Sequence, residues 1–262
     1  MIMDVFAAVD SRISCRWFLD KPVDPAIVRD LVARAARAAS GGNLQPWQIY
    51  ALTGAPLAEI RRRVAHFNAG RDPRHIEAEY PIYPRTMWEP YRSRREEHGV
   101  QLYGALGIGH SDAQARLAQY KRNFEFFNAP VALFVAVDRK LGPGQWADLG
   151  GYIHTLMYLA RGYGLDTCAQ ESWGRMYRLV GEFVTMRPEQ MLFCAVAIGY
   201  GDHAHPANGF RSPRAEPWNS ASFSVLGESL APPPPCARPA CARSASFGGF
   251  VSAEARDHEG GG

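Results

Sequence analysis

Two polar stretches near the N-terminus contain the side chains best suited to holding an anionic ligand. In residues 11–18, Arg12, Ser14 and Arg16 alternate with apolar or small residues. If this segment is extended, the period of two places all three side chains on one face. Two guanidinium groups flanking a hydroxyl group suit a phosphate or another anion. The same alternation is typical of an edge strand with a charged outer face, and these residues alone leave both interpretations open.

The second stretch, residues 38–47, has the sequence AASGGNLQPW and separates a helical segment from a short apolar strand at residues 48–52. Residues 40–42 are predicted to end the helix, because glycine tolerates the left-handed backbone conformation. Asn43 and Gln45 then supply amide donors and acceptors from a tight loop. The stretch is either an ordinary helix-to-strand loop or part of a site for a planar ligand with hydrogen-bonding edges.

Apolar periodicity predicts the helices that position these stretches. Asp24 followed by Pro25 indicates a helix start, with Asp24 as the N-cap, and the helix continues to the second stretch. We expect further helices over residues 3–10 with Phe6 and Val9 facing inward, over 57–67 with its arginines outside, and over 111–127, 146–160 and 176–183. The helix at 146–160 is apolar nearly all round, which indicates the centre of either a large core or a dimer interface.

Two unbroken apolar runs, residues 131–137 and 191–198, predict strands that are buried on both faces. Between them, residues 165–173 are predicted to form a turn. This turn contains two carboxylates, Asp166 and Glu171, but no convincing acid–base pair.

Residues 68–110 are the least regular part of the sequence. They combine prolines and arginines with five aromatic residues, namely Tyr80, Tyr83, Trp88, Tyr91 and Tyr103. Long insertions in compact domains are typical of lids and binding loops, and so many aromatic residues argue against disorder. We expect a lid that lines a pocket for an aromatic substrate; the alternative is a cluster with a packing role only.

Composition limits the classes of protein to consider. The chain has 262 residues, of which 47% are hydrophobic and 21% charged, as is typical of a globular protein with a core. A net charge of +3 gives no indication of a nucleic-acid partner, and the basic runs at 61–63 and 92–95 are typical of solvated helix faces. The N-terminus has neither a basic region nor a long apolar run, so we expect no signal peptide, no membrane partner and a cytoplasmic location.

The last part of the chain differs in composition. Residues 226–262 are rich in proline, alanine, arginine, serine and glycine. Such a segment buries too little apolar surface to offset its ordering entropy, so we expect a disordered tail after a single domain over residues 1–225.

Several kinds of chemistry are not indicated. The five cysteines are odd in number with no CxxC pair, and His203 and His205 lack further ligands, so no metal site is expected. The sequence contains no dinucleotide-binding GxGxxG after a strand, no Walker A motif and no GxSxG nucleophile elbow. A chain with anion-binding arginines but without catalytic side-chain motifs is typical of an enzyme whose chemistry belongs to a cofactor.

Four motifs in order along the chain resemble the FMN-dependent nitroreductase family. They are the segment SRISCRWF at 11–18, the loop ASGGNLQPW at 39–47, the segment GLDTCAQE at 164–171, and Arg211 with Arg214. The resemblance extends over residues 3–220. The insertion at 68–110 and the segment NFEFF at 123–127 are most similar to the nitrobenzoate reductase-like branch.

The resemblance implies an α+β fold, with a central, mainly antiparallel sheet wrapped by helices, and a homodimer with one FMN at each of two interface sites. Arg12, Ser14 and Arg16 would contact the phosphate, ribityl chain and pyrimidine edge of FMN, and Arg211 and Arg214 would complete the phosphate site. The remaining implied cofactor-binding residues are Ser40 and Asn43 from the partner subunit, Gln170, and the backbone of Glu171 and Ser172 near flavin N5.

The implied activity is the NAD(P)H-dependent reduction of nitroaromatic compounds, or of quinones, by a two-electron ping-pong mechanism. NADH or NADPH would leave before an aromatic oxidant binds in the same place. The aromatic insertion and an arginine among residues 92–95 favour an acidic nitroaromatic substrate. The alternatives are another flavin reaction of the same superfamily, namely flavin destruction or reductive dehalogenation, and a non-catalytic flavin-binding protein.

Overall fold

The chain divides into two units, Met1–Pro213 and Arg214–Gly262. The computed structural model describes residues 3–216, 224–225 and 228–229. In the second unit, β5 (Ser224–Val225) pairs antiparallel with β6 (Glu228–Ser229). The rest of the segment that we expected to be disordered lies outside the described residues, and the domain boundary at residue 225 stays a prediction.

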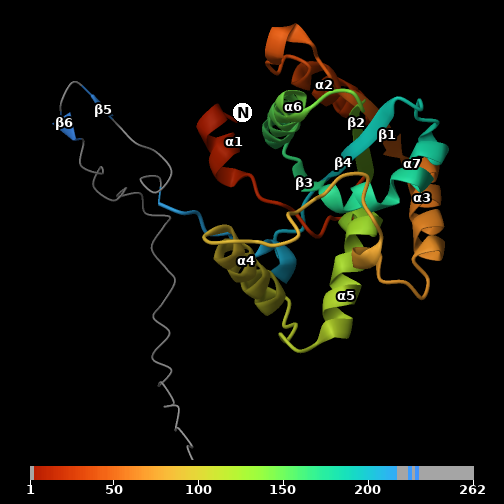
Figure 1. The fold of residues 1–262 in the computed structure, drawn as a ribbon, viewed down its shortest axis with the longest axis vertical. Helices are drawn as coiled ribbons and strands as arrows, with labels where there is room; N and C mark the ends of the chain where they lie inside the picture. Colours follow the sequence, from red (N-terminus) through yellow and green to blue (C-terminus); the bar gives the residue numbers. More distant parts are fainter. Residues whose placement is uncertain (1–2, 217–223, 226–227, 230–262) are drawn as a thin grey trace, which may run out of the picture. The chain divides into compact units, whose positions relative to one another are not determined.

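The first unit is built on a four-stranded sheet (Figure 1). Its strands are β1 (Gln48–Thr53), β2 (Val131–Asp138), β3 (Asp166–Gln170) and β4 (Gln190–Gly199). The strand order is β1-β2-β4-β3, and every neighbouring pair is antiparallel. The two strands predicted from unbroken apolar runs, β2 and β4, are the central ones. This confirms the predicted α+β fold with an antiparallel sheet.

Seven α-helices and five short 3₁₀ helices are assigned in the described part of the chain. The α-helices are α1 (Val5–Ser11), α2 (Pro25–Ala35), α3 (Gly54–Phe67), α4 (Tyr91–Ala105), α5 (Ala113–Lys121), α6 (Pro143–Gly162) and α7 (Tyr177–Val184). The 3₁₀ helices are η1 (Gly41–Asn43), η2 (Pro73–His75), η3 (Arg122–Asn128), η4 (Glu171–Met176) and η5 (Pro206–Asn208).

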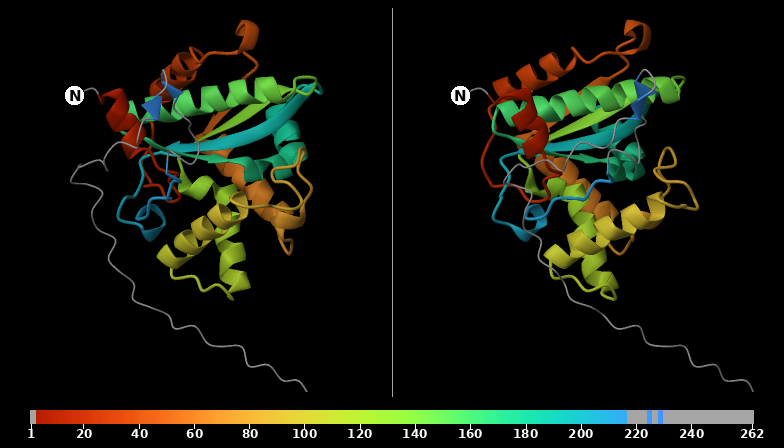
Figure 2. Two further views of the ribbon diagram at one scale, coloured as in Figure 1. Left: turned by 60° about the vertical axis from the view of Figure 1, so that its left-hand side comes forward. Right: turned by 90° about the vertical axis from the view of Figure 1, so that its left-hand side faces the viewer.

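The sheet lies between two hydrophobic clusters. On one face, Leu133 and Val135 of β2 pack with residues of α2 and α6. On the other face, Ala132 and Phe134 pack with residues of α3, η3 and η4. Figure 2 shows α6 and α2 on one side of the sheet and α3 on the other. Because successive side chains of a strand point to opposite faces, a strand covered on both sides is predominantly apolar.

The helix that begins at Pro25 ends earlier than predicted. Its start is as expected, since the Asp24 side chain accepts a hydrogen bond from the Ala26 N–H at 2.8 Å. The last helical residue is Ala35, whereas we expected residues 40–42 to end it. A turn follows, and Gly42 adopts a left-handed φ of 56° only later, inside η1. Alanine-rich sequence favours a helix but does not exclude a turn.

Three side chains face the opposite way from the prediction. On α1, Phe6 is 76% exposed and Val9 is 46% exposed, and the small residue Ala8 is the buried one. A helix packed through alanine directs its larger apolar residues away from the unit. On α3, Arg61 is half-buried and donates a hydrogen bond to the Ala129 carbonyl oxygen, although we expected the arginines of this helix to lie outside. Burial lowers the pKa of the Arg61 guanidinium.

The predicted turn at 165–173 is wrong. These residues contain β3 and the start of η4, and the polar residues Asp166 and Thr167 are buried in the strand. Because these residues are polar, the sequence pattern does not indicate a strand here. The strand forms because it pairs with β4.

The insertion at 68–110 is more regular than predicted. It contains the 15-residue helix α4, which has no buried residue and so no apolar stripe that could predict it. One of its aromatic residues, Tyr80, belongs to the core and stacks on Phe193 at 5.6 Å between ring centroids.

Candidate functional site

The segment that contains Arg12, Ser14 and Arg16 is extended and lies against β3. Ser14 forms a parallel bridge with Thr167, and the Cys15 N–H donates to the Thr167 carbonyl oxygen at 2.9 Å. Cys15 is fully buried between Ser14 and Arg16, which are both partly exposed. Residues 14–16 therefore follow the alternation expected from the sequence: Cys15 points inward, and Ser14 and Arg16 point outward.

Asn208, at the end of η5, holds the Arg16 end of this segment in place. Its Oδ1 accepts from the Arg16 N–H at 2.7 Å, and its Nδ2 donates to the carbonyl oxygens of Trp17 and Asp202 at 2.8 Å each. Asn208 is only 8% exposed. No pattern in the sequence identified this residue, because its partners at Arg16 and Trp17 lie 192 and 191 positions away.

A buried carboxylate supports the other end. The Asp166 side chain, 1% exposed, accepts from Arg161 Nη1 at 2.7 Å and lies 3.0 Å from His203 Nε2. Arg161 Nε also donates to Ser11 Oγ at 3.1 Å. A Cβ atom at Gly201 would lie 2.6 Å from Asp166 Oδ2, so this position requires glycine. Asp166 is therefore a structural ion-pair residue that positions the segment.

The charges of the site suit an anion. Among the described residues, neither Arg12 nor Arg16 forms an ion pair with a carboxylate. Burial, followed by the positive charge of Arg12, lowers the pKa of His154. Burial raises the pKa of the Cys168 thiol, although Arg16 and Arg12 act in the opposite direction. Two guanidinium groups that have no carboxylate partner in the described part of the chain favour the binding of a negatively charged group.

The predicted residues Gln170, Glu171 and Ser172 lie where β3, the strand that the segment contacts at Thr167, passes into η4. Gln170 is buried, and its Nε2 donates to the Asn123 carbonyl oxygen at 2.8 Å. Glu171 is exposed as a residue, yet the protein packed around its carboxyl group raises the pKa of that group by desolvation. Three buried side-chain oxygens here have no hydrogen-bond partner in the described structure, namely Thr167 Oγ1, Gln170 Oε1 and Ser172 Oγ. Such atoms fit a ligand with polar edges, because buried polar groups are normally paired.

The loop at residues 40–45 is held at the other end of α6. Gly41 N–H donates to Asp148 Oδ1 at 3.2 Å, and Ser40 Oγ accepts from the Gln45 N–H at 3.0 Å. Asn43 is exposed and has a left-handed φ of 57°. Asp148 is 13 positions from Arg161, the α6 residue that contacts Ser11, so the two contacts lie about 20 Å apart along the helix. The chain thus holds this loop and the N-terminal segment about 20 Å apart along α6.

The C-terminal arginines have different positions. Arg211 is exposed at the end of the first unit. Arg214 is the first residue of the second unit, so its predicted role at the phosphate stays a prediction.

Helix α4 contributes a residue that we did not predict. His98 Nε2 lies 3.4 Å from Arg16 Nη2, and His98 Nδ1 lies 3.1 Å from Ser212 Oγ. The insertion therefore reaches the N-terminal segment, and its role as a lid over an aromatic substrate stays a prediction. Its aromatic residues Trp88 and Tyr91 are exposed and lie edge to face, with ring centroids 5.5 Å apart.

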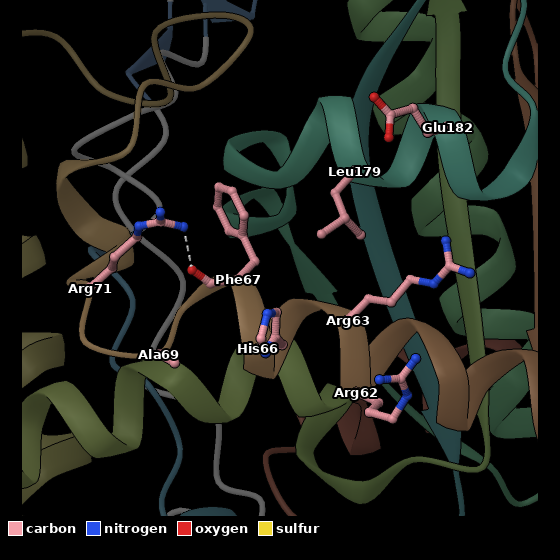
Figure 3. A pocket seen from close by; sticks show the side chains of 8 residues that line it. All are labelled: Arg62, Arg63, His66, Phe67, Ala69, Arg71, Leu179 and Glu182. Atoms are coloured by element: carbon pink, nitrogen blue, oxygen red, sulfur yellow. Dashed lines mark hydrogen bonds between the residues drawn. The ribbon is translucent and has the colours of Figure 1, made fainter.

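A surface pocket of about 580 Å³ lies between α3 and α7 and contains none of the predicted cofactor-binding residues (Figure 3). Three arginines that line this pocket already interact with other groups of the protein. Arg62 Nη2 and Arg63 Nε contact Glu59 at 2.8 and 2.7 Å, and Arg71 lies over the Phe67 ring at 4.7 Å. These cations are less available to an anion than Arg12 and Arg16.

The described ranges contain no candidate metal site and no candidate membrane span. No group of three or more histidine, cysteine, aspartate or glutamate residues is arranged to hold a metal ion there. None of the helices there combines the length and the apolar character that a bilayer span needs.

Comparison with known proteins identifies the family. Residues 9–200 match the family model described as the nitroreductase family. The chain belongs to the nitroreductase family. The matched range contains every predicted cofactor-binding residue from Arg12 to Ser172, whereas Arg211 and Arg214 lie beyond it.

Several members of the nitroreductase family are close relatives. The chain is 38% identical over 203 residues to a 4-nitrobenzoate reductase from Nocardioides sp. (strain LMS-CY). The aligned region covers 76% of this chain and 81% of that protein. The chain is 35% identical to a nitrobenzene nitroreductase from Ectopseudomonas oleovorans, covering 76% and 88%. These relatives confirm the predicted family and its nitrobenzoate reductase-like branch.

A solved structure of this family supports the fold. The crystal structure of the FMN and NADPH-dependent nitroreductase NfnB from Sphigopyxis sp. strain HMH has a TM-score of 0.81 and is 37% identical. The likeness covers 86% of this chain and 100% of that one.

Proposed function

We propose that this nitroreductase-family protein is an FMN-dependent oxidoreductase that uses NAD(P)H to reduce nitroaromatic compounds. The observation that carries the proposal is the pair of arginines, Arg12 and Arg16, with no carboxylate partner in the described structure. Relatives at 35–38% identity are named nitrobenzene nitroreductase and 4-nitrobenzoate reductase, and a similar structure is described as FMN and NADPH-dependent.

The residues present fit FMN. Arg12, Ser14 and Arg16 would hold its phosphate, ribityl chain and pyrimidine edge, because charge-assisted hydrogen bonds from guanidinium groups neutralise phosphate and fix its position. When bound, FMN supplies the redox chemistry of a ping-pong cycle, with NAD(P)H as the electron donor and the nitroaromatic compound as the acceptor. The chain itself supplies binding and orientation. Asn208 holds the Arg16 end of the segment, and Asp166 positions Arg161, which donates to Ser11 at the other end.

The polar atoms at 167–172 support a place for the flavin ring beside β3. Gln170 Oε1 and Ser172 Oγ are buried and lack partners in the described part of the chain. The backbone N–H groups of Glu171 and Ser172 would donate toward flavin N5, and Arg211 with Arg214 would contribute to the phosphate site. A donor fixed beforehand at a reacting atom orients hydride transfer without reorganisation.

We also propose that the protein acts as a homodimer. The loop with Ser40 and Asn43 lies at the end of α6 opposite the contact with Ser11, so it suits the cofactor of a second protomer better than that of its own. The exposed apolar residues Phe6 and Val9 on α1 support this proposal. A protein surface rarely exposes adjacent large apolar residues without a partner.

The substrate is proposed to be an acidic nitroaromatic compound. In the basic run of α4, Arg92 is paired with Glu89 and Arg95 lies over the Tyr83 ring at 4.5 Å, which leaves Arg94 as an exposed cation. If Arg94 recognises a carboxylate, Arg94→Gln raises KM for 4-nitrobenzoate and leaves KM for nitrobenzene unchanged. Equal effects on both substrates would contradict this role.

The cellular location is proposed to be the cytoplasm. The described cysteines Cys15, Cys168 and Cys194 are free thiols, as is usual in a reducing compartment.

An anaerobic titration tests the proposed function. Purified protein is reconstituted with FMN, titrated separately with NADH and NADPH, and then mixed with nitroaromatic compounds and quinones. We expect bleaching of the oxidised flavin by a nicotinamide and its recovery with loss of the nitro group. Protein that remains colourless after reconstitution refutes the proposal. Flavin that neither nicotinamide bleaches indicates a binding protein instead, and FMN loss in air or halide release indicates one of the other flavin reactions.

A further inference from the structure

Helix α4 lies on the surface of its unit. None of its residues is buried, in contrast to α6, which buries six. Figure 1 shows α4 beside the segment that contains η5. Because apolar burial normally anchors a surface helix and no residue of α4 is fully buried, polar contacts must account for much of its position.

His98 makes the contacts that connect α4 to the cofactor-binding segment. Its Nε2 lies 3.4 Å from Arg16 Nη2, its Nδ1 lies 3.1 Å from Ser212 Oγ, and its ring lies 5.8 Å from the Phe210 ring between centroids. The imidazole therefore joins three segments, namely α4, the N-terminal segment and residues 210–212.

The chemistry of the partners assigns the protons. A guanidinium group has only donors, so His98 Nε2 must be the acceptor for Arg16. In a neutral imidazole the proton is then on Nδ1, which donates to Ser212 Oγ. This arrangement uses both ring nitrogens and directs one guanidinium N–H of Arg16 toward α4.

Arg16 has further constraints that make its orientation specific. Its Nη1 donates to the Ser14 carbonyl oxygen at 3.2 Å, and its backbone N–H donates to Asn208. With the backbone and one guanidinium nitrogen held, the contact with His98 restricts the second terminal nitrogen. A long side chain that is restricted at several points loses less entropy when it binds a ligand.

We propose that His98 is a positioning residue for the cofactor site. It orients the Arg16 guanidinium and ties α4 to the N-terminal segment, so that FMN binding and the closure of α4 are coupled. The inference rests on the proposed role of Arg16 in binding FMN. Coupling between two events is reciprocal, so whatever orders Arg16 also orders α4.

Three substitutions of His98 separate its contact with Arg16 from its contact with Ser212. His98→Leu removes both. His98→Gln places an amide near the position of Nε2 and keeps an acceptor for Arg16, whereas His98→Asn places one near Nδ1 and keeps only the contact with Ser212. His110→Gln is the matched control, because His110 is an exposed histidine outside the proposed site.

The first measurement is FMN affinity, from the quenching of FMN fluorescence by apo-protein. We expect His98→Leu and His98→Asn to weaken binding about three- to tenfold, since tenfold corresponds to about 1.4 kcal/mol. His98→Gln should restore most of the affinity, and His110→Gln should equal the wild type. We also expect a more negative flavin midpoint potential in His98→Leu, because a displaced Arg16 stabilises the anionic reduced flavin less. A role confined to folding would not shift the potential.

The second measurement is amide hydrogen exchange in residues 91–105, with and without FMN. FMN should slow exchange there in the wild type and in His98→Gln but not in His98→Leu. Unchanged affinity and unchanged FMN-dependent protection in His98→Leu would overturn the inference. If the wild type binds no FMN, the proposed function fails separately. In that case, the apo-proteins still test whether His98 attaches α4 to the N-terminal segment. Faster amide hydrogen exchange in residues 91–105 of His98→Leu than of the wild type supports this attachment, and equal exchange refutes it.

Discussion

Replacement of Asn208 by alanine is expected to affect both the stability of the protein and its cofactor affinity. The side chain makes three hydrogen bonds of 2.7 to 2.8 Å, to the Arg16 N–H and to the carbonyl oxygens of Trp17 and Asp202. At about 1 kcal/mol for each net hydrogen bond, Asn208→Ala should cost about 3 kcal/mol of the free energy of unfolding. In a unit of this size, about 2–4 °C per kcal/mol gives a decrease of about 6–12 °C in Tm.

The same substitution should loosen Arg16. The Arg16 backbone loses its acceptor, so its guanidinium is positioned less well, and we expect FMN affinity to fall about tenfold, which is about 1.4 kcal/mol. Thermal unfolding of the apo-protein, followed by circular dichroism at one protein concentration, measures the first effect. An FMN titration measures the second. Gln114→Ala, which removes an exposed amide from α5, is the control. A Tm within 2 °C of the wild type, together with wild-type FMN affinity, would refute the positioning role of Asn208.

Three further outcomes are expected. Gly201→Ala should destabilise the protein by about 1–3 kcal/mol, because its Cβ would lie 2.6 Å from Asp166 Oδ2 and 3.0 Å from Cys15 Sγ; an unchanged urea midpoint would contradict this. Asn43→Ala should weaken FMN retention on gel filtration without lowering the Tm of the apo-protein, and unchanged retention would count against the proposed contribution of this loop to the partner's cofactor. Burial raises the folded-state pKa of Glu171 above its unfolded value of about 4.3, so its contribution to stability is present below that value and is lost as pH rises through the folded pKa. Glu171→Gln should therefore raise the Tm relative to the wild type at pH 8 more than at pH 4, and a lower relative Tm at pH 8 would show that the ionised carboxylate is stabilising.

Local patterns in the sequence were sufficient for the parts of the fold that depend on short-range chemistry. The apolar runs at 131–137 and 191–198 predicted β2 and β4, because a strand covered on both faces is usually a nearly continuous apolar run. Asp24 and Pro25 predicted the start of α2, because an N-cap interaction involves only neighbouring residues.

Patterns that depend on packing were predicted less well. The strand β3 was predicted as a turn, since Asp166 and Thr167 are polar and their burial depends on Arg161 and on β4. The helix α4 has no apolar stripe, so its sequence contained no periodic signal. On α1, both faces carry apolar residues, and only the contact with α6 shows that Ala8 is the buried one.

The residues of the candidate site also fall into two groups, those predicted from local spacing and those whose contacts depend on the folded structure. The types and spacing of Arg12, Ser14 and Arg16 predicted an anion-binding segment, because alternation along an extended chain is a local property. The residues that orient this segment, Asn208 and His98, are 192 and 82 positions from Arg16. Their contacts require the chain to return to the same place, and hydrogen bonds across such separations leave no periodic pattern in the sequence. Composition and spacing therefore indicated which groups are candidates for binding an anion, whereas only the packing of the folded unit shows which residues contact them.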